Sequence, residues 1–466
     1  MTLPIRQVAP ELPLVRVDVV ERRGRARKGT LRCEMGGNLQ FSTISIESYF
    51  FAKWDPVLYD SLLIAAAVEF CDLVKKRPKL SWGREIHLRV PVHDLKHWNS
   101  GEVSESLHDA LDFLTGDKWN ISFCSRRHEA APIRQGSLAL KSEFTAVMPF
   151  SDGMDSWAVA ELMTRQYQGS LALVRLGSKG FKWKKHGGYN RPFSSVPYHV
   201  LEGTHRFRES SARSRGFKFT LISGIAGYLS KASHIIISES GQGALGPALV
   251  TVGQAYPDYR NHPVFTNKMA EFFDALLGYK VNYTYPRLWS TKGQTLAKYV
   301  SECRDVSGLW LETKSCWQQN RHVSVNGKAR QCGICAACML RRLAVHTAGL
   351  SEPNTTYVWE DLQANSFEKG AAAAFERKKI TRAMGQHAIA GVLHLDHLAG
   401  LRDSPMNERA LELNAFQLGR SLNLPQQKVR KKLENLLLQH GTEWKSFMKS
   451  LGPRSFVANW AIQSRQ

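Results

Sequence analysis

The hydrophobic positions between residues 144 and 238 form short apolar runs that alternate with helical patterns. The apolar runs are FTAVMPF at 144–150, SLALVRL at 170–176 and HIIIS at 234–238. Apolar side chains recur at helical spacing within residues 155–166 and 219–231. Strands that alternate with helices in this way favour a parallel sheet covered by helices on both faces. We therefore predict an α/β fold with a doubly wound parallel sheet.

The chain on either side of this stretch follows different patterns. Residues 1–140 mix strand-like and helical pieces, which predicts an N-terminal α/β accessory domain. The strand-like pieces lie at 39–45, 85–92 and 119–124, and the helical ones at 55–76 and 104–115. Further on, amphipathic helices are predicted at 367–384, 408–422 and 426–451. The predicted domains are 1–140, 141–352 with the doubly wound sheet, and the helical C-terminal domain 353–466.

The composition narrows the class of protein. Of the 466 residues, 43% are hydrophobic, which is enough for each domain to bury a core. Because no apolar run reaches the roughly 18 residues of a membrane span and the first residues lack a secretory pattern, we expect a cytoplasmic protein with no membrane partner. The formal net charge of +22 favours polyanionic ligands or acidic partners. The basic tracts 22–32 and 428–432 lack aromatic residues, so nucleic acid is the less favoured partner.

The first apolar run of the predicted sheet ends in the polar stretch SDGMDS at 151–156. In open parallel sheets, ligands bind beyond the carboxyl ends of the strands, near the N-terminus of the next helix. Ser151, Gly153 and Ser156 supply the hydroxyl groups and the close backbone approach that a phosphate chain needs. Asp155 is a suitable ligand for Mg²⁺. The alternative is an ordinary strand-to-helix turn capped by Ser and Asp.

Four of the eight cysteines lie within one short stretch. Cys316 precedes Cys332, Cys335 and Cys338, and the last three form a C-x2-C-x2-C motif. Four thiolates fill a tetrahedral coordination shell and leave no place for water, which is typical of a structural zinc site. An iron–sulfur cluster is the alternative.

These motifs together resemble a known family. SDGMDS is similar to the SGGxDS pyrophosphate loop of the ATP pyrophosphatases. With the cysteines, with AYPDYR at 255–260 and with Lys292 in STKGQTL, the chain from about 144 to 350 resembles the 7-cyano-7-deazaguanine synthases (QueC). Asp152 and Tyr259 depart from the family, which has a glycine and a cysteine at these positions. The extra carboxylate of Asp152 would repel pyrophosphate unless a metal ion or a basic residue compensates it.

The resemblance also implies roles for individual residues. The phosphates of ATP would be held by Ser151, Gly153, Met154 and Ser156. The catalytic residues would be Asp155 with Mg²⁺, Lys292, which neutralises the departing pyrophosphate, and Arg215, which reaches phosphate. The 7-deazaguanine substrate would be bound by Glu239, Tyr256, Asp258 and Arg260.

The function implied by this resemblance is that of an ATP-dependent C–N ligase. Such an enzyme adenylates the carboxylate of a 7-deazaguanine and then transfers the acyl group to an amine. Enlarged relatives occur in bacterial anti-phage defence operons, including Qat systems. There the family resemblance implies that the amine is the N-terminus of a partner protein from the same operon.

Three other functions stay open at this point. The first is synthesis of free 7-cyano-7-deazaguanine by the same chemistry. The second is a degenerate loop in a scaffold that binds nucleotides or nucleic acid, which the positive charge of the chain suits. The third is sulfuration or lysidine-type modification of tRNA, although the clustered thiols that sulfuration would use are assigned to zinc.

Overall fold

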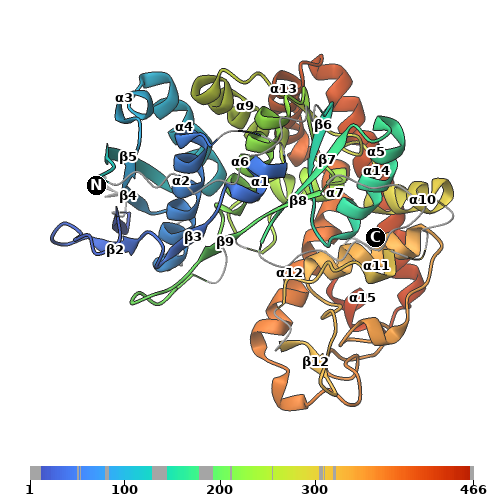
Figure 1. Cartoon of the computed structure of the whole chain (residues 1–466). Coiled ribbons are helices and arrows are strands. Elements are labelled where there is room, and N and C mark those ends of the chain that lie inside the picture. Colours follow the sequence, from blue (N-terminus) through green and yellow to red (C-terminus); the bar gives the residue numbers. More distant parts are fainter. Residues whose placement is uncertain are drawn as a thin grey trace, which may run out of the picture.

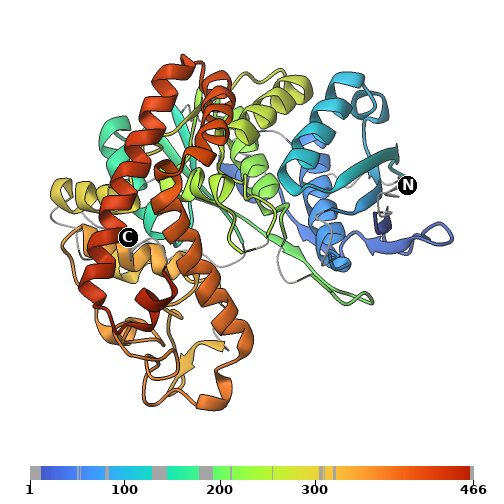
Figure 2. The same cartoon turned by 180° about the vertical axis from the view of Figure 1, so that it is seen from behind.

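The computed structural model of the chain describes residues 12–49, 52, 54–78, 83–127, 144–177, 193–209, 212–253, 255–303, 308, 310–318 and 322–461. Figures 1 and 2 show it from opposite sides, with the first sheet at one side, the second sheet in the middle and the C-terminal helices at the other side. Among the described residues, no helix is both long enough and apolar enough to cross a membrane.

Four parallel strands in the order β2-β1-β4-β5 form the first sheet. Their bounds are β1 Leu14–Val20, β2 Leu31–Glu34, β4 Glu85–Val92 and β5 Lys118–Ser125. Alternate apolar residues of the strands, such as Val17 and Leu88, are buried in one cluster with residues of the helices α2 (Pro56–Val74) and α4 (Gly101–Thr115). Two short helices, α1 (Ile44–Tyr49) and α3 (Leu95–Trp98), complete this region.

The strand predicted at 39–45 is much shorter than expected. Strand β3 (Leu39–Phe41) pairs antiparallel with β9 (Tyr198–Val200) and so connects the N-terminal region to the middle of the chain. The prediction is wrong beyond Phe41, because Ser42 and Thr43 cap the start of α1 at Ile44. The Ser42 hydroxyl accepts the N–H of Ile44, and the Thr43 carbonyl accepts the N–H of Ile46.

Five parallel strands in the order β11-β10-β6-β7-β8 form the second sheet, so the predicted parallel sheet is confirmed. Their bounds are β6 Ala146–Pro149, β7 Leu171–Leu176, β8 Phe193–Val196, β10 His234–Ile236 and β11 Asn282–Thr284. The chain first adds strands on one side of β6 and then returns to add β10 on the other side. The strand order therefore reverses between β6 and β10, the position where open α/β sheets bind ligands.

Helices cover both faces of the second sheet. On one face, Met148, Leu173 and Ile236 pack with residues of α5 (Met154–Tyr167). On the other face, Val147 and Ile235 are buried with residues of α6 (Arg215–Ser230) and α9 (Pro263–Leu277). Consecutive residues thus face opposite layers, which explains why these strands are apolar throughout.

The N-terminal region and the second sheet share one hydrophobic cluster. Helix α4 packs against α9, and α2 packs against α6. Leu63 and Leu107 of the N-terminal helices belong to the same buried cluster as Ile225 and Phe272 of α6 and α9. The helices between the two sheets therefore form a common layer, which Figure 1 shows between the blue and green strands.

Helices dominate the C-terminal region, as predicted. Figure 2 shows the long helix α14 beside the middle of the molecule. The predicted helices at 408–422 and 426–451 are confirmed as α13 (Glu408–Leu422) and α14 (Gln426–Leu451). The remaining helices from residue 241 on are α7 Gly241–Ala244, α8 Gly246–Leu249, α10 Lys292–Glu302, α11 Ala336–Thr347, α12 Arg382–Gly400 and α15 Phe456–Trp460.

The helix predicted at 367–384 is wrong before Arg382, where α12 begins. Residues 367–375 instead surround the buried Trp359. The Trp359 indole N–H donates to the carbonyl oxygen of Phe367 at 2.8 Å, and its ring stacks on the Phe367 ring. Ala371 forms an isolated bridge with Trp359. Packing around one large aromatic side chain thus overrides the local helical pattern.

Candidate functional site

Residues 150–153 connect β6 to α5, and residues 154–156 form the first turn of this helix, at the position where the strand order reverses. The Ser151 and Ser156 hydroxyl oxygens lie 2.9 Å apart, and Ser151 Oγ also accepts the N–H of Gly153. Ser156 Oγ lies 3.4 Å from the hydroxyl of Ser238, which follows β10. No side chain caps α5, so the first N–H groups of this helix keep their capacity to bind an anion. The hydroxyl groups and helix N-terminus suit a phosphate group.

Asp155 and Lys292 form a buried ion pair behind this loop. Each residue is only 6% exposed, and Lys292 Nζ contacts Asp155 Oδ2. Burial and the charge of Arg341 lower the pKa of Lys292 to about 7, whereas the adjacent carboxylate favours its charged form. Asp155 Oδ1 is buried and has no hydrogen-bond partner in the part of the chain that the structure describes. A buried oxygen of this kind suits a metal ligand.

The negative charge of Asp152 in this loop is compensated within the structure. Arg175, at the end of β7, donates to both carboxylate oxygens of Asp152, at 2.6 and 3.0 Å. The Asp152 carbonyl accepts the N–H of Lys314 at 2.7 Å. The Asp152 side chain is thus directed to Arg175, which neutralises its charge.

Lys292 is positioned by residues of the C-terminal region. Its backbone N–H donates to Gln242 Oε1 at 2.8 Å, and Gln242 Nε2 lies 2.7 Å from His440 Nδ1 in α14. His440 Nε2 lies 2.8 Å from the Leu395 carbonyl oxygen. Because the amide of Gln242 donates to Nδ1, the proton of the neutral imidazole is on Nε2 and donates to Leu395. Helix α14 thereby fixes the start of α10.

This chain of hydrogen bonds predicts a pH-dependent stability. Burial lowers the pKa of His440 from 6.5 to about 4. Between these values the unfolded chain binds more protons than the folded one, so stability is full above pH 6.5 and decreases as the pH falls toward 4. We expect His440 alone to reduce the free energy of unfolding by about 2 kcal/mol at pH 5. Urea unfolding at pH 7 and pH 5 measures this difference in the free energy of unfolding.

His440→Gln should reduce that difference between the two pH values, because the substituted side chain does not titrate. His199→Gln, at an exposed histidine, is the matched control and should keep the wild-type difference. An equal pH dependence in wild type and His440→Gln would contradict the protonation argument.

The predicted substrate residues Glu239, Asp258 and Arg260 lie near one another. Arg260 Nε donates to Asp258 Oδ2 at 2.7 Å, and the Asn261 amide donates to Glu239 Oε2 at 3.2 Å. Burial raises the pKa of Glu239 to about 7, and the charge of Arg260 opposes this. A Cβ atom on Gly243 would lie 2.1 Å from Glu239 Oε1, so only glycine leaves room for this carboxyl group. These residues can offer both hydrogen-bond acceptors and a cation.

Tyr256 is held against the N-terminal region, whereas Arg215, the first residue of α6, has an exposed side chain. Desolvation by the surrounding residues and the like charge of Arg260 lower the pKa of Arg215. The Tyr256 hydroxyl donates to the Phe113 carbonyl oxygen at 2.9 Å, and its ring lies against Gly116. Tyr256 therefore contacts α4 and the turn that follows it, and its place in a substrate pocket stays a prediction.

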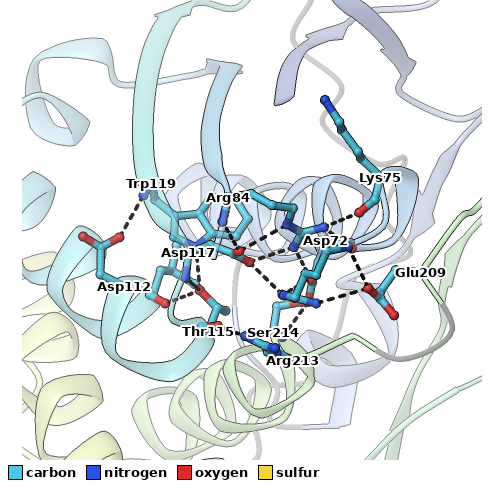
Figure 3. Close-up of polar contacts among 12 residues, drawn as sticks. Asp72, Lys75, Arg84, Asp112, Thr115, Asp117, Trp119, Glu209, Arg213 and Ser214 are labelled. Carbon is cyan, nitrogen blue, oxygen red and sulfur yellow. Dashed lines mark hydrogen bonds and ion pairs between the residues drawn. The ribbon is translucent and has the colours of Figure 1, made fainter. Parts of the chain in front are cut away.

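A buried ion-pair network fixes the segment before Arg215 (Figure 3). Arg84 bridges Asp72 and Asp117, at 2.7 Å to each, and Arg77 also pairs with both carboxylates. Asp72 Oδ2 accepts the backbone N–H of Ser214 at 2.8 Å. Because Ser214 precedes Arg215, the network sets where α6 begins. Sequence analysis gave no role to these residues, since they are far apart in the chain.

We expect Asp72→Asn to destabilise the protein strongly. The substitution keeps the shape of the side chain but leaves two buried guanidinium groups with Asp117 as their shared carboxylate. We expect this to lower the free energy of unfolding by about 3 kcal/mol. Asp109→Asn is the matched control, because its ion pair with Lys268 is exposed and contributes at most about 1 kcal/mol. Urea unfolding compares the two variants. Equal effects would contradict the role given to the network.

The four cysteines of the predicted metal site lie together. Their sulfur atoms all fall within 4.8 Å of one another, and Cys332 Sγ is 3.7 Å from Cys338 Sγ. A tetrahedral zinc ion with bonds of about 2.3 Å holds sulfur atoms about 3.8 Å apart. The backbone N–H of Cys332 donates to Cys316 Sγ, and that of Cys335 donates to Cys332 Sγ. The cysteines can hold one ion such as zinc, whereas a cluster of several iron atoms would separate them further.

The metal site also connects to the phosphate-loop candidate. Gln331 accepts the N–H groups of Ser315 and Cys316, so the segment that carries Cys316 is fixed beside it. The same segment contains Lys314, whose N–H donates to Asp152 of the loop. The segment of the metal site thereby supports the loop at 151–156 through the backbone of Asp152.

Comparison with known proteins adds no family to this description. No known protein family matches the chain, and no curated protein matches its sequence. Any assignment of function to this chain therefore rests on the residues of the site and on the motifs in its sequence.

Proposed function

We propose that the protein adenylates the carboxylate of a 7-deazaguanine with ATP and transfers the acyl group to an amine. One observation carries this proposal: a buried Asp155–Lys292 pair, with an unpartnered Asp155 oxygen, lies behind the hydroxyl-rich loop 151–156. The loop occupies the ligand-binding edge of the second sheet. Asp155 and Lys292, from two of the sequence motifs that resemble the deazaguanine synthases, are in contact at this edge.

The residues of the loop fit the phosphates of ATP. Ser151 and Ser156 can donate hydroxyl hydrogen bonds, and the N-terminus of α5 favours negative charge. Asp155 Oδ1 would bind Mg²⁺, which offsets the charge of the phosphates when it is bound. Lys292 lies beside the same carboxylate, where its positive charge would stabilise pyrophosphate.

The proposed reaction has two steps. A carboxylate oxygen of the deazaguanine forms a bond to the α-phosphorus of ATP, and the bond from that phosphorus to pyrophosphate breaks. An amine nitrogen then forms a bond to the acyl carbon, loses a proton and displaces AMP. The product is an amide. The side chains would contribute by placing the reactants and by stabilising charge.

Glu239, Asp258 and Arg260 are the residues that we propose for the deazaguanine. The Glu239 carboxyl is partly buried and can accept hydrogen bonds from the N–H groups of a purine-like ring. Arg260 contributes a guanidinium group, which forms an ion pair with Asp258. Arg215, also near this group, adds a cation for phosphate or carboxylate.

We propose the N-terminal amine of an acidic partner protein as the acceptor. The formal charge of +22 supports a partner of opposite charge. Formation of the free nitrile is the alternative outcome of the same adenylation. The mass of the product separates the two, because conjugation adds a deazaguanine to a polypeptide.

The test measures pyrophosphate released from ATP and Mg²⁺ with and without 7-carboxy-7-deazaguanine. Release that depends on this acid supports the proposal. Intact-mass analysis of proteins encoded beside the chain, co-expressed with it, then identifies the acceptor. ATP binding without turnover of any deazaguanine would instead indicate a scaffold and overturn the proposed reaction.

A further inference from the structure

A second group of functional side chains lies at the carboxyl edge of the first sheet. His93 directly follows β4, and Arg126 directly follows β5. The two strands are paired up to Val92 and Ser125, and the Arg126 N–H donates to the Val92 carbonyl oxygen at 3.0 Å. This is the edge at which open parallel sheets bind ligands.

This edge belongs to the sheet at one side of the molecule, whereas α5, whose start carries the proposed ATP site, lies at the other side (Figure 1). The network of Asp72, Arg84 and Asp117, which contacts the start of α6, lies at the amino ends of β4 and β5. The eight residues of β4 separate it from His93 by about 26 Å. A ligand at the carboxyl edge would therefore occupy a separate site.

Asp60 of α2 orients His93. Asp60 Oδ1 lies 2.7 Å from His93 Nδ1, and Asp60 Oδ2 accepts the backbone N–H of His93 at 2.8 Å. The Asp60 side chain is 0% exposed and that of His93 is 9% exposed. Because the carboxylate accepts the Nδ1–H group, Nε2 is directed away from Asp60.

Several nitrogen atoms of this group have no partner. His93 Nε2, Arg126 Nε, Arg126 Nη1 and the Trp54 indole Nε1 are buried and make no hydrogen bond within the part of the chain that the structure describes. A buried donor without a partner is destabilising by about 1–3 kcal/mol, and more when it is charged. Such groups in one place indicate an absent water molecule, ion or ligand.

Aromatic rings bring these donors together. The Trp54 ring lies 5.5 Å from the His93 ring, and the Tyr59 ring lies 5.8 Å from it, both edge-on. The Arg126 guanidinium stacks over the Tyr59 ring at 4.7 Å. His93 and Arg126 thus flank the same tyrosine. The small exposed fraction of His93 places the group just below the surface.

The unpartnered N–H donors of Arg126 and Trp54 favour an oxyanion. Both oxygens of Asp60 accept hydrogen bonds from His93, and the nearby guanidinium of Arg126 offsets the charge of Asp60. The guanidinium of Arg126 adds a positive charge, and the Trp54 indole adds a neutral donor. The groups available here are hydrogen-bond donors, which can bind an oxyanion.

We propose that His93, Arg126 and Trp54 bind a phosphate or carboxylate group at the carboxyl edge of the first sheet. Asp60 is a positioning residue that holds the imidazole for this purpose. The site gives the N-terminal region a ligand of its own, independent of the ATP site.

The test titrates full-length protein containing ¹⁵N-labelled histidine with inorganic phosphate and, separately, with acetate. The nuclear magnetic resonance signal of His93 is assigned by its absence from His93→Gln. We expect a saturable change of this signal with one of the anions, and the effective anion identifies the ligand as phosphate or carboxylate. An anion that binds at the loop 151–156 would leave this signal unchanged.

Arg126→Gln should weaken this binding by about tenfold or more, because a charged hydrogen bond is lost. Arg127→Gln, one residue further on, is the matched control and should bind as wild type does. Trp54→Phe keeps an aromatic ring but removes the indole donor, and it should also weaken binding. This variant serves as the test if Arg126→Gln does not fold. A His93 signal that ignores both anions, or responds equally in wild type, Arg126→Gln and Trp54→Phe, would overturn the proposal.

Discussion

Replacing Cys332 by serine is expected to remove the bound metal ion and unfold the C-terminal region. Cys332 and Cys338 belong to one buried cluster with Trp359 and Trp444, so an ion held by these cysteines would lie within the core that joins α11 to α12 and α14. Structural zinc contributes on the order of 10 kcal/mol, which is comparable to the total stability of a typical domain. Elemental analysis should change from one ion per chain to almost none, and circular dichroism should show lost helix.

Cys124→Ser is the matched control, since Cys124 lies outside the cluster and should leave the metal content unchanged. Because Lys314 connects the metal segment to Asp152, the Cys332 variant should also lose nucleotide binding. Wild-type protein that contains no metal, and whose stability resists chelators, would contradict the assignment. A brown protein that contains several iron atoms per chain would show that the cysteines bind an iron–sulfur cluster and not zinc.

Asp155→Asn is expected to reduce pyrophosphate release by about a thousandfold while the protein stays folded. The amide has the size of the carboxylate, but it cannot carry the charge that pairs with Lys292 and attracts Mg²⁺. The loss of the carboxylate also leaves Lys292 buried without an anion beside it, which lowers the fraction of Lys292 that is charged. The assay compares turnover at saturating ATP and Mg²⁺ with the melting temperature of each variant.

Asp152→Asn is the matched control from the same loop, because Asp152 is 44% exposed and points to Arg175. It should keep most of the activity. Calorimetric titration with ATP and Mg²⁺ gives a second readout that does not depend on turnover, and Asp155→Asn should weaken this binding. Wild-type affinity and turnover in Asp155→Asn would contradict its role as the metal ligand.

The sequence allowed prediction of what depends on neighbouring residues. The apolar runs around β6, β7 and β10 are short and flanked by helical patterns, so the parallel sheet was predictable. The spacing of Cys332, Cys335 and Cys338 was enough to place three sulfur atoms together. Helices α13 and α14 were predicted to the residue, because strong amphipathic patterns determine both.

Contacts between distant segments could not be predicted in this way. Arg175 compensates Asp152 from the next strand, and His440 supports Lys292 through Gln242. No local pattern marks these residues, since each acts only after the chain has folded. The helix predicted before Arg382 failed for the same reason, because Trp359 draws that segment into its own packing.

The Asp152–Arg175 pair makes the loop at 151–156 close to electroneutral before any nucleotide arrives. A phosphate chain that binds there would compete with Asp152 for the same guanidinium, so binding amounts to an exchange of counter-ions. In the proposed reaction, Asp152 would pair with the guanidinium again when pyrophosphate leaves. We therefore expect this loop to hold its product less tightly than a loop with glycine at this position, and to favour release over retention.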